Sequence, residues 1–277
     1  MSRSKTKKKS KATDIVYYII MLILLAVMAV SGFKVYKIAS EYKKGTEVYD
    51  NIAEEVGALP PPEREEMEQV HLDTRLDINW GKLEDKNSDI KAWIRCMGTV
   101  INYPIVQGSD NDYYLTHLLD GTWNNKGTLF VDYRCGDPFN DFLTIVYGHR
   151  MKDKSMFYLL GEYFENKELP YFAEHPKMEL YTPEKNYDVQ IFAAAVIDSR
   201  DEFLYNFYLY DEDEQQRYIN WLFSNNQLVG FDNSVSVTTN DHIILMSTCT
   251  LRGSDVDDNR VVVWGKLVEV DRDLSGN

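Results

Sequence analysis

The sequence has 277 residues, of which 44 % are apolar and 13 % aromatic, and its formal net charge is −14. This length and composition suit one globular domain with a full hydrophobic core and exclude a disordered chain. The charge is uneven, because residues 1–44 contain ten basic and two acidic residues, a net +8, whereas the rest carries −22. An acidic body argues against nucleic acid as its ligand.

The N-terminus combines positive charge with a long apolar run. Six basic residues precede residues 15–33, a stretch of 19 residues without charge. As a helix this stretch nearly spans a hydrocarbon core of about 30 Å. The basic residues predict a cytoplasmic tail at 1–14, a transmembrane anchor at 15–33 and a body outside the cell. A buried core helix and a signal peptide cleaved near Ser31 are the alternatives, but the run exceeds the roughly 7 to 15 residues of a signal peptide.

Residues 34–83 are predicted to be a linker with one or two helices that lift the body from the membrane and pack on its side. The proline run at residues 60–62 precedes several charged residues. This combination is typical of a stiff spacer or a helix start. Nothing in this stretch indicates chemistry.

The body, residues 84–277, is predicted to consist mainly of β-strands. Eight strands suit a small closed barrel, so the expected fold class is mostly β with a few peripheral helices. One helix is expected around residues 156–163 and another at 211–225, from their i, i+3, i+4 apolar spacing. The strands are expected, from their apolar or alternating pattern, at 100–106, 127–133, 142–148, 178–182, 188–198, 234–238, 242–248 and 260–270.

The predicted strand at 242–248 delivers Ser247-Thr248-Cys249 to the start of a polar segment, and Arg260 opens the next strand. A thiol at the exposed end of a rigid strand is well placed for chemistry. If the two strands pair, the guanidinium of Arg260 and the thiol share one edge of the sheet. A free thiol, with a pKa of about 8.5, is mostly protonated at neutral pH, so a nucleophilic cysteine needs a histidine partner.

His149 is the predicted partner, because it also ends an apolar run at the exit of a strand. His242 precedes Cys249 by seven residues on one strand, which places it roughly 23 Å away, and it is excluded. His71, His117 and His175 lie in a charged linker, a short helix and beside a proline, so each is expected to be a surface or capping residue.

Other assignments of the cysteines and the arginine stay open on the residues alone. Cys135, in a turn near Arg134, is a rival nucleophile. Cys96 and Cys135 are candidates for a disulfide if Cys249 is the free thiol. Arg260 is either a donor in a cleft or the surface partner of Asp257 or Asp258, and Arg252 is the alternative arginine.

Together, Tyr147-Gly148-His149, Ser247-Thr248-Cys249 and Arg260 resemble the histidine, cysteine and arginine motifs of sortases, the membrane-anchored cysteine transpeptidases of Gram-positive bacteria. Class B is the most similar branch. Two departures are Arg150, where the class usually has Asn, and Thr250-Leu251-Arg252, where an acidic residue and an aromatic are common. Both bear on the substrate motif. The resemblance extends over residues 87–270 and includes 87–94, 103–107 and 110–115.

This resemblance implies a sortase-like barrel in which the helix at 211–225 roofs a substrate groove; a helix that simply covers a barrel edge is the alternative interpretation. Cys249 is expected to attack the carbonyl of a threonine in the C-terminal sorting motif of a secreted protein, with His149 as acid and base and Arg260 as oxyanion donor. The acceptor is an amine of a peptidoglycan cross-bridge or a pilin lysine. Peptide-binding roles are implied for Asn111, Leu115, Ser247 and Thr248.

No cofactor is expected for this chemistry. The cysteines and histidines lack the spacing of zinc ligands, and the acidic residues match no calcium loop. Two other functions are compatible with the residues: a cysteine protease that transfers the acyl group to water, and an anchored peptide-binding module without catalysis.

Overall fold

The computed structural model describes residues 11–58, 75–165, 171–230, 234–249 and 258–271. These residues form two units, divided between Lys44 and Gly45. The first unit is helical and belongs to α1 (Lys11–Val56), the one described helix that is long and apolar enough to cross a membrane, with a mean hydropathy of 2.5 in its most apolar window. Its large apolar side chains from Ile15 to Phe33 are exposed. Length, composition and exposure are those of a candidate membrane anchor.

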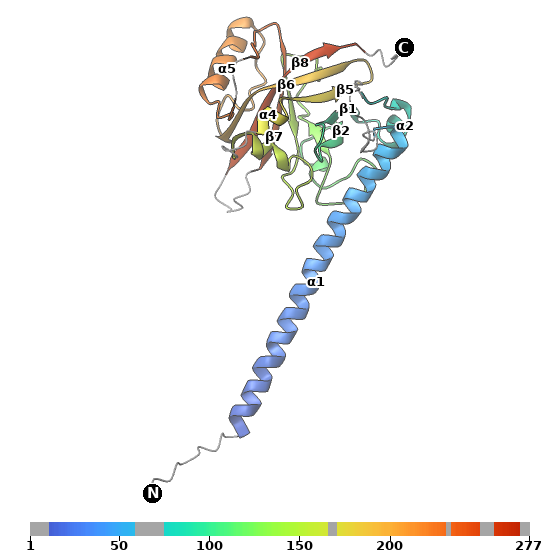
Figure 1. Cartoon of the computed structure of the whole chain (residues 1–277), viewed down its shortest axis with the longest axis vertical. Coiled ribbons are helices and arrows are strands. Elements are labelled where there is room, and N and C mark those ends of the chain that lie inside the picture. Colours follow the sequence, from blue (N-terminus) through green and yellow to red (C-terminus); the bar gives the residue numbers. More distant parts are fainter. Residues whose placement is uncertain (1–10, 59–74, 166–170, 231–233, 250–257, 272–277) are drawn as a thin grey trace, which may run out of the picture. The chain divides into compact units, whose positions relative to one another are not determined.

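The second unit is built on eight strands that close into a barrel in the order β1-β2-β3-β4-β7-β8-β6-β5 (Figure 1). The predicted fold class, a mostly β protein with an eight-stranded barrel, is therefore confirmed. The pairs β2·β3 and β4·β7 are parallel and the others are antiparallel. The strands are β1 (Ile90–Arg95), β2 (Asn102–Val106), β3 (Leu129–Val131), β4 (Leu143–Tyr147), β5 (Lys177–Tyr181), β6 (Asn186–Asp198), β7 (His242–Cys249) and β8 (Asn259–Val270).

Short helices surround the barrel, and α5 (Glu212–Ser224) is the longest of them. The carboxylate of Asp211 accepts a hydrogen bond from the amide of Glu214 at 2.8 Å and so caps its first turn, which is acidic and suits the helix dipole. Buried Tyr218 accepts a hydrogen bond from Trp264 Nε1 on β8 at 3.0 Å. The predicted helix at 211–225 is therefore present. The others are α2 (Trp80–Lys86), η1 (Tyr113–Leu115), η2 (Tyr158–Gly161), α3 (Glu162–Glu165) and α4 (Tyr171–Glu174).

The outer wall formed by β4, β7, β8 and β6 carries a second apolar layer beneath α5. Alternate residues of these strands, such as Ile145, Leu245 and Trp264, pack there with Tyr218 and Leu222 of the helix. A side-chain period of two sends the next residue of each strand to the barrel interior. By the same alternation, every second residue towards the ends of these strands also lies on the outer face.

One of the predicted strands is wrong in the structure. Residues 234–238 form no strand, although Val235 and Val237 pack partly buried against the outer apolar layer. Instead β1, which the residue pattern left unassigned, takes a place in the barrel between β2 and β5. The closed ring leaves no free edge for the alternating segment. The helix expected around 156–163 is present at 158–165, as the 3-10 turn η2 followed by α3. The proline run lies outside the described residues.

Candidate active site

The three residues proposed to carry the chemistry lie at one rim of the barrel. Strands β4 and β7 run parallel with Tyr147 opposite Ser247, and the Gly148 amide donates to the Ser247 carbonyl at 3.1 Å. Both strands therefore end at the same side of the sheet: β4 leads to His149, and β7 ends in Cys249. On the other side of β7, Cys249 is the direct antiparallel partner of Arg260 on β8. Opposite partners place their Cβ atoms about 4.5 to 5.5 Å apart on one face.

A pocket of about 360 Å³ opens at this rim. All seven residues that the sequence singles out for catalysis or peptide binding line it: Asn111, Leu115, His149, Ser247, Thr248, Cys249 and Arg260. Four further residues complete the lining and were not assigned a role from the sequence. They are Phe130, Tyr147, Gly148 and Tyr205. Tyr147 had a usable signal, because the two-residue period of β4 places it on the same face as His149.

Among the three cysteines, only Cys249 is exposed, and all three are free. Burial raises the pKa of the Cys96 thiol to about 11, and burial does the same to the pKa of Cys135. Both therefore stay protonated near neutral pH and are poor nucleophiles. The disulfide considered between Cys96 and Cys135 is not formed, and the burial of Cys135 argues against it as the rival nucleophile.

His149 is half-buried and its ring is held by a backbone group. Its Nε2 lies 2.7 Å from the carbonyl oxygen of Leu115, the last residue of η1. A carbonyl oxygen only accepts, so Nε2 carries the proton of this bond and Nδ1 is the nitrogen left to exchange a proton with a reacting group. Leu115 thus contributes its main chain to the site as well as its side chain to the pocket wall.

The other histidines are placed away from this arrangement. The ring of His117 stacks on Tyr113 at 4.0 Å between centroids, and His175 packs on Tyr171 at 4.3 Å. His242 begins β7, at the opposite end of the strand from Cys249, and its Nδ1 lies 3.1 Å from the Asp141 carbonyl oxygen. His71 lies outside the described residues.

Arg260 is half-buried and has no carboxylate partner among the described residues. Its Nη1 donates to the carbonyl oxygens of Asn259, at 3.2 Å, and of Asp258, at 3.4 Å. The carboxylate of Asp258 instead lies 3.8 Å from Nε of Arg200. The ion pair considered between Arg260 and Asp258 is therefore absent, while Asp257 and the alternative Arg252 lie outside the described residues.

A buried carboxylate organises the pocket wall. Asp132 is fully buried and accepts hydrogen bonds from Asn111 Nδ2 and Tyr147 Oη, both at 2.9 Å, and from Arg134 Nη2 at 2.8 Å. Burial alone would raise the pKa of this carboxyl, but the hydrogen bonds from Arg134 and its neighbours hold it below its ordinary range. Asn111 also accepts from the Tyr133 amide at 3.1 Å, so it is anchored to the wall and keeps one N–H for a ligand.

The residues before the nucleophile differ in their contacts. Ser247 Oγ lies 2.8 Å from the hydroxyl of Tyr205, which belongs to the segment that leads into α5. Thr248 is buried, and its Oγ1 has no hydrogen-bond partner within the described part of the chain. Because side chains alternate along β7, Ser247 and Cys249 share a face and Thr248 points to the other. Ser247 is therefore the better placed of the two to contact a peptide by its side chain.

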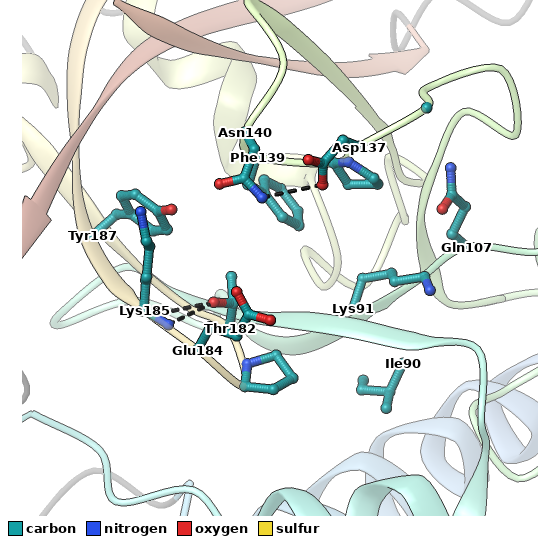
Figure 2. Close-up of a pocket in the computed structure, with 13 residues that line it drawn as sticks. Ile90, Lys91, Gln107, Asp137, Phe139, Asn140, Thr182, Glu184, Lys185 and Tyr187 are labelled. Carbon is teal, nitrogen blue, oxygen red and sulfur yellow. Dashed lines mark hydrogen bonds between the residues drawn. The ribbon is translucent and has the colours of Figure 1, made fainter.

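A second hollow of about 350 Å³ lies at the other end of the barrel, between the start of β1, the loop before β4 and the β5–β6 turn. Figure 2 shows Lys91, Asp137 and Lys185 around this space, with Asn140 donating to Asp137 at 3.0 Å. Its lining contains no cysteine and no histidine. This hollow therefore offers no nucleophile and base of the kind found at the rim that carries Cys249.

Comparison with known proteins agrees with this geometry. The chain is 32 % identical over 253 residues to sortase B of Listeria monocytogenes, covering 89 % of this chain and 94 % of that protein. The structure of B. anthracis sortase B in complex with AAEK1 matches 84 % of this chain and all of that one, with a TM-score of 0.65 and 29 % identity. A Staphylococcus aureus sortase B–substrate complex matches 69 % of this chain and 85 % of that one, at TM-score 0.61 and 28 % identity. No family model matches the chain.

The closed eight-stranded barrel resembles these structures, and together with the exposed Cys249 at its rim it defines the class of protein as a cysteine transpeptidase of the sortase type. Within that class, the identity and coverage of the Listeria relative determine the branch to which this chain belongs. The chain belongs to the class B sortases.

Proposed function

We propose that this sortase cleaves a C-terminal sorting motif after a threonine and transfers the acyl group through a thioester on Cys249 to an amine. The observation that carries the proposal is the register of three strands. The pairing of β4 with β7 and of Cys249 with Arg260 gathers a thiol, an imidazole and a guanidinium around one pocket. This is the set of groups that acyl transfer requires: a nucleophile, an acid and base, and an oxyanion donor.

In the first half-reaction, Cys249 has given its thiol proton to Nδ1 of His149, and its Sγ forms a bond to the threonine carbonyl carbon while the carbonyl oxygen takes up the negative charge. Donors of Arg260 that its two backbone contacts leave unused stabilise that oxygen. The C–N bond then breaks, and Nδ1 of His149 gives its proton to the departing amine. The acyl group remains on sulfur as a thioester.

In the second half-reaction, the acceptor amine attacks the thioester carbonyl and loses a proton to Nδ1 of His149. A new amide forms and the C–S bond breaks, which restores the sulfur and the imidazolium of the starting state. We assign the acceptor as an amine of a peptidoglycan cross-bridge or a pilin lysine, and the donor as a secreted protein with a C-terminal motif. The S. aureus sortase B–substrate complex supports substrate binding by a barrel of this kind.

The direct test is to incubate the full chain in detergent micelles with a library of threonine-containing peptides and oligoglycine. Mass spectrometry should detect a peptide joined to glycine after threonine, in larger amount than the hydrolysed peptide. Hydrolysis without transfer would assign the protein to cysteine proteases. Peptide binding without cleavage, with a Cys249 that alkylating reagents label no faster than Cys135, would make it a binding module.

We further propose that the apolar run at residues 15–33 anchors the enzyme with its N-terminus in the cytoplasm and the barrel outside. The support is a candidate membrane helix preceded by a cluster of basic residues. Protease added to intact cells should remove the barrel and spare the basic tail. Release of an intact barrel with a new N-terminus near Ser31 would identify a signal peptide instead.

A further inference from the structure

One buried lysine lies between the base of α1, residues 45–56, and the segments that hold His149. The side chain of Lys126 is 1 % exposed, and its Nζ contacts the Oγ1 of Thr46 on α1 at 2.6 Å. The same Nζ contacts Ser155 Oγ and Asp153 Oδ2, both at 2.8 Å, in the loop that follows His149. A buried ammonium is costly unless all its donors are used, so this position ties three segments together.

A first connection runs from Lys126 to the ring of His149. The next residue, Gly127, has φ of 58°, and a Cβ there would lie 2.2 Å from the Tyr114 carbonyl oxygen and 2.8 Å from that of Leu115. The backbone after Lys126 thus lies directly against the end of η1, and the Thr128 amide donates to the Tyr114 carbonyl at 2.9 Å. That end of η1 supplies the Leu115 carbonyl that holds Nε2 of His149.

A second connection runs to the backbone of His149. Asp153 and Ser155 belong to the loop that leaves His149 and returns to it, where the Phe157 amide donates to the His149 carbonyl at 3.0 Å. Burial alone would raise the pKa of Asp153, but its hydrogen bonds with Lys126 and Ser155 hold it below the ordinary range. The carboxylate is thus kept charged as the partner of the lysine.

The base of α1 reinforces the same two segments. Tyr49 donates from its hydroxyl to the Gly127 carbonyl, and its Oη also lies 2.9 Å from Thr128 Oγ1. Its ring packs edge-on against Tyr103 at 5.4 Å between centroids. The Tyr103 hydroxyl in turn accepts from the Met156 amide, in the loop after His149, at 3.2 Å.

We propose that Lys126 is a positioning residue for His149, and that through it the base of α1 is part of the support of the active site. The inference rests on the proposed role of His149. The inference gives residues 45–56, the base of α1, a role in catalysis. They hold both the ring and the backbone of His149 in the orientation that acyl transfer needs. Displacement by about 1 Å of a group that must lie within reach of the reacting atoms costs up to 100-fold in rate.

The test is Lys126→Met in the full chain, which keeps the length of the side chain and removes its donors. We expect kcat for transfer to fall about 10- to 100-fold with KM for the peptide changed less than about twofold, since Lys126 does not itself line the peptide pocket. Thr46→Val, which removes one acceptor on α1, should give a smaller loss of the same kind, about threefold. If Lys126→Met does not fold, Thr46→Val decides: an unchanged kcat would overturn the inference.

Two controls separate positioning from general destabilisation and from failure of the proposed mechanism. Glu179→Gln breaks a buried ion pair elsewhere in the barrel and should lower the melting temperature without lowering kcat. The alkylation rate of Cys249 by iodoacetamide gives a readout that needs no turnover. Lys126→Met should slow it in the wild-type background and add nothing to His149→Ala. Full transfer activity in His149→Ala would instead disprove the proposed function, and equal slowing by Lys126→Met in both backgrounds would disprove positioning through His149.

Discussion

The barrel contains two cysteine–arginine neighbours with opposite surroundings. In the first, Cys96 follows Arg95 at the end of β1, and both are buried. Arg95 Nε donates to the Glu179 carboxylate at 2.6 Å, and Glu179 also accepts from the Tyr181 hydroxyl at 2.8 Å. The charge of Arg95 is therefore matched by the buried carboxylate of Glu179. In the second, Cys249 and Arg260 face each other across β7 and β8, the thiol is exposed, and no described carboxylate neutralises the guanidinium.

The difference shows that environment, more than residue type, separates structural from chemical groups. A buried arginine that has a carboxylate partner helps to specify the packing of β1 against β5, and burial keeps the thiol beside it protonated. An arginine without such a partner retains donors for a charge that develops on a ligand.

The largest effect is expected at the nucleophile. Cys249→Ala should abolish both cleavage and transfer, whereas Cys96→Ala should leave the activity of the folded protein largely intact. Cys249→Ser should be nearly inactive as well, because His149 alone does not generate a serine alkoxide at neutral pH. Peptide cleavage followed by mass spectrometry measures all three. Turnover by Cys249→Ala would end the assignment.

The thiols should also differ in their reaction with iodoacetamide. A thiol whose pKa is raised to about 11 by burial, as in Cys96 and Cys135, exposes its thiolate only as the pH rises toward that value. At pH 8 only about one in 1,000 of each buried thiol is ionised, so we expect labelling of the native protein to occur at Cys249 and to be slower by about 100-fold or more at Cys96 and Cys135. Peptide mapping reads the sites. Prompt labelling of Cys135 would restore it as a rival nucleophile.

Arg260 is expected to affect the rate and leave stability almost unchanged. Arg260→Ala should lower the transfer rate by about 100-fold, as the loss of one oxyanion donor does, and Arg260→Lys should be impaired to a lesser degree because the fork geometry is lost. The melting temperature should change little, since the residue is half-buried at the rim. Normal rates in both variants would remove Arg260 from the active site and point to Arg252.

For the buried pair of Arg95 and Glu179 we expect the opposite: a loss of stability with almost no change in rate. Glu179→Gln leaves the charge of Arg95 buried without its carboxylate, which should cost about 3 to 5 kcal/mol of unfolding free energy. The kinetic constants of the fraction that remains folded should stay within about twofold of the parent's values. Denaturant unfolding and steady-state transfer, measured on one preparation, test both halves. A stable but inactive variant would contradict the separation between the two regions.

Local patterns in the sequence were enough to predict most strands and to single out candidate residues at their ends. Apolar runs predicted β4, β7 and β8, and the proposed catalytic residues lie at their boundaries: His149 follows β4, Cys249 ends β7 and Arg260 lies at the start of β8. A strand exits its sheet where the apolar pattern stops, so the end of a run is a local property. The membrane helix candidate and α5 followed equally from apolar length and helical spacing.

Tertiary structure decided which segments pair. Residues 234–238 alternate like a strand yet form none. In contrast, β1 takes a place in the barrel although its mixed sequence did not predict a strand. A strand exists only where the edge of a partner strand is open. The roles of Tyr205, which meets Ser247, and Lys126, which meets Thr46, depend on contacts across 42 and 80 positions of the chain. Local periodicity carries no information about such distances, since chain closure and side-chain packing fix them only when the whole barrel has formed.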